Sequence, residues 1–321
     1  MNELLDILTY RREHGSKGEK AFISKYLKDF KPYKNPAGEI LAYVHEIKSK
    51  HHNKILWSCH IDTMHRSNPN TIKQNVFLDP YNVAFVDHKS DCLGADNGAG
   101  VWIMLEMIRA GVAGSYVFHR GEEKGCIGSS QMASDHTSWI KKHTHAFAFD
   151  RKGTTSFITH QMGSRCCSDD MAMHVIKGLD LGYVLDDTGV YTDTAEYAHL
   201  IPECVNLSVG YASEHSSTET LDVDHVVRLK DALIKIQWDK VPIKRKAEPK
   251  IDKYAGFYNE MPMYEDLMYM DHRSIKEWIK KTDPSMVAYA IQDLIDQIDF
   301  LNQSYNDPYN QTHYQTDTLP F

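Results

Sequence analysis

Residues 115–130 read SYVFHRGEEKGCIGSS, an apolar stretch that runs directly into two adjacent glutamates. The apolar part, 115–120, has the length and the aromatic and β-branched content of a short buried strand. Glu122 and Glu123 therefore stand at the end of a predicted strand. They are either solvated loop charges or two carboxylates with different tasks in one site. Partner residues elsewhere in the chain are needed to support the second interpretation.

Apolar runs of strand length recur along the first 240 residues, and helical patterns separate them. The other strand candidates are 39–44, 54–61, 145–150, 155–160 and 204–210. The helix candidates are an amphipathic N-terminal stretch, 17–30, 97–110, 167–177 and 223–238. Strands that alternate with helices predict an α/β fold with a mixed, largely parallel central sheet flanked by helices. Functional residues of such sheets collect at the carboxyl ends of the strands.

The predicted α/β domain occupies residues 1–240. Residues 241–271 begin with the basic, proline-containing VPIKRKAEPK and are predicted to be a linker. Residues 272–303 are predicted to form a C-terminal helical hairpin, whose second helix carries an apolar stripe from Val287 to Leu301. That stripe either packs on the catalytic domain or mediates self-association. The polar stretch 304–321 is predicted to be disordered.

Composition narrows the class of protein. The net charge of −8 at pH 7 argues against a nucleic-acid partner. No run of about 18 uncharged apolar residues predicts a membrane span, and the N-terminus does not have the pattern of a signal peptide. The six cysteines lack regular spacing, which is typical of reduced thiols in a cytoplasmic protein. Eighteen histidines permit metal chemistry without establishing it.

A second polar group follows the strand candidate 54–61, in the sequence WSCHIDTMH. His60 and Asp62 are two residues apart, so their side chains point to the same face of an extended chain. Histidine is a good zinc ligand, and a nearby carboxylate can hold its other ring nitrogen. The pattern alone is weak, because a single histidine at a strand end is more often an ordinary core or surface residue.

Three more residues complete the candidate set. Asp96 lies between glycines in CLGADNGAG at a helix start, where it either bridges cations or acts as an N-cap. Asp87 and Asp91 are the alternatives to Asp96. Asp150 ends the strand HAFAFD, and His215 follows a strand in GYASEHSS. With His60 and Glu123, these side chains form the nitrogen and oxygen ligand set expected for zinc, cobalt or manganese.

The motifs in this order resemble those of the di-metal peptidase superfamily, which contains the co-catalytic zinc aminopeptidases, carboxypeptidases and amidohydrolases of the M20, M28 and M42 families. The resemblance rests on H-x-D-T, G-A-D-N-x-A-G, G-E-E-x-G-x-x-G-S, F-D and a late E-H-S, and it spans about residues 15–240. Each motif is weak alone, whereas five in order are specific. The resemblance implies a zinc-exopeptidase-like fold and two divalent metal ions, expected to be zinc, with cobalt or manganese as alternatives.

The resemblance also implies a role for each residue. His60 and Asp150 would bind one metal, Glu123 and His215 the other, and Asp96 would bridge them. The remaining two would be catalytic. Asp62 would orient His60, and Glu122 would be the general base, which accepts a proton from water and passes it to the leaving amine.

Two further stretches resemble the substrate side of the family. GVYTDTAEYAHLIP suggests that Thr192 and Asp193 line the wall of a pocket, or else form a helix N-cap. Arg165 either binds a substrate carboxylate or forms a surface salt bridge. The interval between Asp150 and His215 is too short for the separate lid or dimerisation domain of many members. The chain therefore resembles the compact, lidless M28-type aminopeptidases most closely.

The predicted function is that of a metal-dependent hydrolase, an aminopeptidase acting on short peptides. An amidohydrolase or deacylase of N-acylated amino acids would use the same site with a different pocket. A rival from another class is an inactive scaffold that keeps the fold. Loss of a ligand or of the base would favour the scaffold, and none of these residues is missing from the sequence.

Overall fold

The computed structural model describes residues 1–48, 54–68, 70–247, 276 and 280. By internal contacts the chain divides into two compact units, Met1–Lys250 and Ile251–Phe321. Apart from Lys276 and Lys280, the predicted helical hairpin and the predicted tail lie outside the described residues, as does most of the predicted linker. Both large sheets and all the candidate site residues belong to the first unit.

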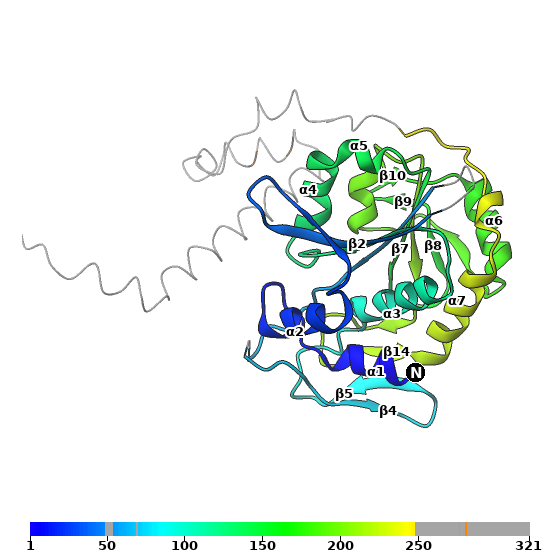
Figure 1. The fold of residues 1–321 in the computed structure, drawn as a ribbon. Coiled ribbons are helices and arrows are strands. Elements are labelled where there is room, and N and C mark those ends of the chain that lie inside the picture. The colour runs from blue at the N-terminus through cyan, green and yellow to red at the C-terminus, as the bar shows by residue number, and fades with distance from the viewer. Residues whose placement is uncertain (49–53, 69, 248–275, 277–279, 281–321) are drawn as a thin grey trace, which may run out of the picture. The chain divides into compact units, whose positions relative to one another are not determined.

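The first unit is built on an eight-stranded mixed sheet (Figure 1). Its strands, in spatial order, are β1 (Lys31–Lys34), β2 (Ile40–Ile47), β6 (Gly114–His119), β3 (Ile55–His60), β7 (His145–Arg151), β12 (Glu203–Ser208), β8 (Ser156–Ile158) and β11 (Val184–Asp186). The central strands β6, β3, β7 and β12 run parallel to one another, whereas β1, β2 and the β12–β8 pair are antiparallel. The mixed, largely parallel sheet expected from the sequence is confirmed.

Helices cover both faces of this sheet (Figure 1). One face carries a core shared with α1 (Asn2–Thr9), α2 (Lys17–Tyr26), α3 (Ala95–Arg109), α6 (Asp169–Leu179) and α7 (Val223–Lys235). The other carries a smaller core shared with α4 (Ile127–Asp135), α5 (Thr137–Ile140) and the 3₁₀ helix η1 (Asp193–Tyr197). A second 3₁₀ helix, η2 (Trp238–Lys240), follows α7. Because both faces are covered, the central strands are apolar along nearly their whole length.

Alternation along the strands assigns side chains to the two cores. On β3, Trp57 packs into the larger core and Leu56 into the smaller one. His60 is an even number of residues from Leu56, so it projects to the side of α4 and η1. All six positions of β3 are buried, which keeps His60 out of water although it ends the strand.

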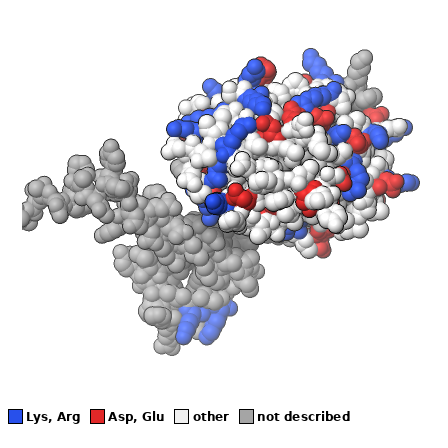
Figure 2. Space-filling view, turned by 90° about the horizontal axis from the view of Figure 1, so that it is seen from below, with Lys and Arg blue, Asp and Glu red and all other residues white. Residues whose placement is uncertain are grey.

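A second, four-stranded sheet packs beside the first (Figure 1). Its strands, in spatial order, are β13 (Tyr211–Ala212), β14 (Thr220–Asp222), β5 (Val83–Val86) and β4 (Val76–Leu78). Phe77 and Phe85 stack on it and are both exposed. The face of the molecule on which β4 and β5 lie carries an uncharged area between charged residues (Figure 2). None of β4, β5, β13 and β14 was predicted from the sequence.

A short hairpin of β9 (His160–Gln161) and β10 (Ser164–Arg165) follows β8. All six cysteines are free and buried. Among the residues that the structure describes, no helix has the length and apolar character to cross a membrane.

Candidate metal centre

The carboxyl ends of β3 and β7 bring His60 and Asp150 together. The Nε2 atom of His60 lies 3.2 Å from Oδ1 of Asp150. A register shift between β7 and β12 places an extra residue in β7 between Ala148 and Arg151, where Asp150 lies. Bulges of this kind re-aim a side chain at a strand end. Asn206 holds the irregular backbone, since its amide accepts from the Asp150 N–H and donates to the Asp150 carbonyl, both at 2.9 Å.

Asp96 lies between two groups of possible ligands. Its Oδ1 is 3.0 Å from Nε2 of His60, and its Oδ2 is 3.2 Å from Nε2 of His215. The backbone at Asp96 and Asn97 is not helical, so the regular turns of α3 begin after them. The Asp96–Asn97 peptide bond is cis. The two distances show that each oxygen of the Asp96 carboxylate faces a different histidine.

Glu123 and His215 complete the second group. The Nε2 atom of His215 lies 3.0 Å from Oε2 of Glu123, and ligand atoms of Asp96, Glu123 and His215 all lie within 4.8 Å of one another. The same holds for the group His60, Asp96 and Asp150. The fold thus brings together both sets of residues paired by the family resemblance, with Asp96 in each, and it also places ligand atoms of His60, Glu122 and Glu123 within 4.8 Å of one another.

Glu122 faces the first group from the β6 end. Its Oε2 lies 3.9 Å from Nε2 of His60, and its Oε1 accepts a weak hydrogen bond from the Cys126 thiol at 3.6 Å. Burial raises the pKa of Glu122 well above the usual range, and the carboxylates of Asp150 and Asp193 add to the rise. A carboxyl group with a raised pKa is suited to exchange protons near neutral pH.

Asp62 holds the loop that carries both glutamates. Its Oδ1 accepts from the N–H groups of Gly121 and Glu122 at 2.9 and 3.2 Å, and its Oδ2 accepts from Glu123 N–H at 3.1 Å. The expected contact with His60 is made by the Asp62 carbonyl oxygen, 3.1 Å from Nδ1, while the nearest carboxylate oxygen is 3.8 Å away. Asp62 therefore supports the general-base candidate at least as directly as it supports His60.

Glu219 holds the backbone at Asp96 in the way that Asp62 holds the loop of the two glutamates. Its role was not predicted from the sequence. Its side chain is buried, and its two oxygens accept from the N–H groups of Gly94 and Asp96, each at 2.9 Å. Burial raises the pKa of Glu219 to about 7. In the sequence it is one glutamate in the polar run HSSTET, so no local signal separates it from a solvated charge.

Further polar contacts orient Asp150. Thr192 Oγ1 donates to Asp150 Oδ2 at 2.6 Å, and Asn97 Nδ2 donates to Oδ1 at 3.0 Å. The approach of Asn97 requires a glycine at position 100, where an added Cβ would lie 2.2 Å from Oδ1 of Asn97. Arg12, fully buried, ties the two neighbouring segments together by donating to the carbonyls of Ile61 at 2.7 Å and Gly94 at 2.9 Å.

The donor set fits divalent cations. Carboxylates of four residues converge with two histidines in a mostly buried space: Asp96, Glu122, Glu123 and Asp150, with His60 and His215. The Oε1 atom of Glu123 is buried and has no hydrogen-bond partner. Burying several carboxylates and leaving one oxygen without a donor is costly unless positive charge is supplied. Two divalent cations would supply that charge, with one group of three ligands each and Asp96 shared.

The residues considered for the substrate side are either buried or paired at the surface. Thr192 and Asp193 are both buried, because Thr192 binds Asp150 and Asp193 lies 3.2 Å from Nδ1 of His119. Neither side chain is at the surface, so they do not form a wall that a substrate can touch. Arg165 is exposed and pairs with Asp169 at 2.7 Å. This is the surface salt bridge that was one of the two roles considered for Arg165 from the sequence.

The two aspartates considered as alternatives to Asp96 have local roles. Asp91 lies 2.7 Å from the Arg11 guanidinium and accepts from Ser67. Asp87 accepts from the N–H of Lys89 at 2.8 Å in an exposed turn. Neither belongs to a group of possible metal ligands in the part of the chain described.

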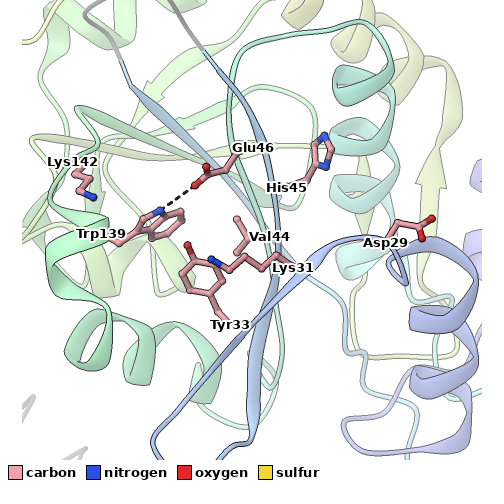
Figure 3. A pocket seen from close by; sticks show the side chains of 8 residues that line it. All are labelled: Asp29, Lys31, Tyr33, Val44, His45, Glu46, Trp139 and Lys142. Carbon is pink, nitrogen blue, oxygen red and sulfur yellow. Dashed lines mark hydrogen bonds between the residues drawn. The ribbon is translucent and has the colours of Figure 1, made fainter.

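A cavity beside α5 is separate from this centre. It measures about 550 Å³ and lies along β1 and β2 beside α5 (Figure 3). Trp139 forms part of its lining and donates its indole N–H to Glu46 at 3.1 Å, while Lys31 lies over the ring of Tyr33. Its lining contains none of the candidate metal ligands.

We expect Glu219→Gln to weaken metal binding by about 10–100-fold, the range seen when a residue that orients a metal ligand is lost. A glutamine keeps the size but presents one NH₂ group to a backbone N–H, which frees the segment that carries Asp96. Competition with a chromophoric chelator would measure the zinc affinity. The exposed Glu39→Gln is the matched control, and an unchanged affinity in Glu219→Gln with normal thermal unfolding would contradict the positioning role.

Part of the chain matches a known protein family. Residues 42–166 match the sequence model of Peptidase family M28, and this segment contains His60, Asp96, Glu122, Glu123 and Asp150. None of the curated proteins matches the sequence.

Solved structures resemble the fold at low sequence identity. Aminopeptidase PepT from Bacillus cereus has a TM-score of 0.60 at 13% identity, over 74% of this chain and 97% of that chain. A tripeptidase from Staphylococcus aureus has a TM-score of 0.59 at 13% identity, over 73% and 95%. The TET1 peptidase of Pyrococcus horikoshii has a TM-score of 0.55 at 15% identity, over 73% and 98%. At these identities the likeness shows the fold.

Proposed function

We propose that the chain is a metallopeptidase of the di-metal superfamily, and that it is an aminopeptidase that removes the first residue of short peptides with two bound zinc ions. The match of residues 42–166 to Peptidase family M28 and the fold support this proposal. The observation that carries the proposal is the position of Asp96. Its two oxygens face His60 and His215, which belong to different groups of three ligands. A carboxylate shared in this way suits a pair of cations better than a single one.

The proposed ligands are His60, Asp96 and Asp150 for one ion and Asp96, Glu123 and His215 for the other. Nitrogen and oxygen donors of this kind suit zinc, and cobalt or manganese would fit the same set. When bound, two such ions polarise a scissile carbonyl and lower the pKa of water.

Glu122 is the proposed general base. It accepts a proton from the attacking water and returns it to the amine that leaves. Asp62 keeps Glu122 in place through the backbone N–H groups of the loop. Thr192 and Asn97 hold the two oxygens of Asp150, so that this carboxylate keeps one orientation during the reaction.

Two features favour an aminopeptidase over an amidohydrolase of N-acylated amino acids. The solved structures that resemble the fold include a protein named an aminopeptidase and one named a tripeptidase. Arg151 and Lys152, the cations that follow Asp150, are already paired with Asp186 and Glu214. These ion pairs offset the positive charge that would attract the carboxylate which an N-acyl amino acid presents next to its scissile amide.

Zinc-loaded protein is expected to hydrolyse tripeptides with a free N-terminus and to leave N-acetylated forms of the same peptides and N-acetyl amino acids intact. Release of the free N-terminal amino acid would be followed by chromatography. Removal of metal by a chelator should abolish turnover, and added zinc should restore it. Preferential cleavage of N-acetyl amino acids would favour the amidohydrolase, and no cleavage of either class by metal-loaded protein would favour the inactive scaffold.

A cytoplasmic location and self-association are further parts of the proposal. The TET1 peptidase is described as assembling into a tetrahedron or a large octahedral shell. Self-association through residues 272–303 concerns a segment almost wholly outside the described residues. Light scattering on the full chain would measure the oligomeric state.

A further inference from the structure

The loop 187–191 lies at the edge of the metal centre because both of its ends are tied to the end of β7. Thr192, which follows the loop, donates to Asp150 at 2.6 Å. Thr188 accepts from the guanidinium of Arg151 at 3.1 Å. Two residues of chain span at most about 7 Å, so the backbone of Val190 lies within that reach of Thr192. The loop is therefore fixed beside a proposed metal ligand.

A second turn is joined to this loop. Met162, in the turn between β9 and β10, donates its backbone N–H to the carbonyls of Gly189 and Val190 at 3.0 and 3.1 Å. The close packing requires glycine at position 189, where an added Cβ would lie 2.2 Å from the carbonyl oxygen of His160. The two turns thus form one unit next to Asp150.

This unit exposes large apolar side chains. Val190 is 65% exposed, Met162 69% and Tyr191 44%. Tyr191 is anchored, since its hydroxyl donates to Glu196. Grouped apolar side chains at the edge of a catalytic centre mark a surface that a ligand covers. The polar neighbours Thr192 and Asp193 are buried, so Val190 and Tyr191 contribute the exposed surface of this stretch.

We propose that Met162, Val190 and Tyr191 form the wall that receives the side chain of the first residue of the substrate, and that the enzyme therefore prefers peptides beginning with leucine, methionine or phenylalanine. This inference rests on the proposed aminopeptidase function. It assigns the specificity to three exposed side chains rather than to Thr192 and Asp193.

The chemistry of the wall favours apolar over acidic side chains. The unbranched thioether of Met162 adapts to ligands of different shape, whereas the anchored ring of Tyr191 provides a rigid surface. Asp187 begins the same loop and is exposed. Its negative charge disfavours a substrate that begins with aspartate or glutamate.

The test compares kcat/KM of the zinc-loaded full chain on Leu-Gly-Gly and Ala-Gly-Gly. The wild-type protein is expected to prefer the leucine peptide by at least about tenfold, as apolar contacts in a specificity site allow. The double variant Met162→Ser/Val190→Ser is expected to lose most of this preference, mainly through slower cleavage of the leucine peptide. Val184→Ser is the matched control, because Val184 is an exposed valine on β11 that precedes the same loop.

The possible outcomes distinguish failure of the proposed specificity wall from failure of the proposed aminopeptidase function. An unchanged leucine-to-alanine ratio in the double variant would overturn the wall while leaving the aminopeptidase in place. A wild-type enzyme that cleaves the alanine peptide as well as the leucine peptide would overturn it too. Failure of the wild-type protein to cleave either peptide would instead remove the proposed function on which the wall rests.

Discussion

Replacing Glu122 by glutamine is expected to lower kcat for a tripeptide by about 10²–10⁴-fold, the contribution of a well-placed general base. Glutamine keeps the shape of the side chain but cannot accept a proton from water. Glu122 is in neither of the two proposed ligand groups that share Asp96, although its carboxylate lies within 4.8 Å of ligand atoms of His60 and Glu123, and it donates its backbone N–H to Asp62 in either form. The loss should therefore fall on turnover and not on metal content or folding.

Three measurements on the Glu122→Gln protein would establish this. Steady-state kinetics would give kcat, elemental mass spectrometry the zinc content, and thermal unfolding the stability. Glu39→Gln, a change of the same chemistry at an exposed position, is the control and should behave as the wild type. Turnover within a few-fold of the wild type would remove Glu122 as the base, and loss of zinc would make it a ligand instead.

Replacing the proposed ligands should reduce the metal content in steps. Protein supplied with zinc and freed of excess is expected to hold about two equivalents. His215→Ala removes a ligand from one group only, so it should leave about one equivalent. Asp96→Ala removes the shared carboxylate and leaves buried charges without a bridge, so it should reduce binding at both positions.

The control for this series is His174→Ala, which removes an exposed histidine on α6. It should keep about two equivalents. Equal zinc content in wild type and His215→Ala would exclude His215 as a ligand. An Asp96→Ala protein that still binds one ion tightly would show that the two positions do not share this carboxylate. Thermal unfolding in the presence of a chelator would separate loss of metal from loss of fold.

Residues at strand ends were predictable, because the signal is local. An apolar run followed by a polar residue places that residue at the end of a buried strand, and parallel strands bring their carboxyl ends to one edge. His60 and Asp150 meet for this reason, at the ends of β3 and β7. The loop glutamates follow β6 in the same way, next to β3 in the sheet.

Residues whose role depends on contacts with segments distant in the sequence were not predictable. Glu219 lies in the polar run HSSTET and Arg12 in the charged run RREH, and only the folded chain shows that both are buried against the backbone of the segment around Gly94. The four-stranded sheet was missed because its strands are short. It pairs β14 with β5 across a long interval of sequence, and such pairing leaves no local periodicity.

The sequence by itself determined the type of fold and the set of side chains that could hold metal, since both follow from apolar periodicity and from the order of polar residues after strands. Tertiary structure decided which oxygen faces which partner. It set the two oxygens of Asp96 toward His60 and His215. It placed the Asp62 carboxylate where it accepts hydrogen bonds from the backbone of the glutamate loop. It also buried Thr192 and Asp193 and exposed Val190 and Tyr191. The physical reason is that strand and helix patterns depend on neighbours in sequence. Burial, hydrogen-bond partners and side-chain direction depend instead on segments that meet only when the chain has folded.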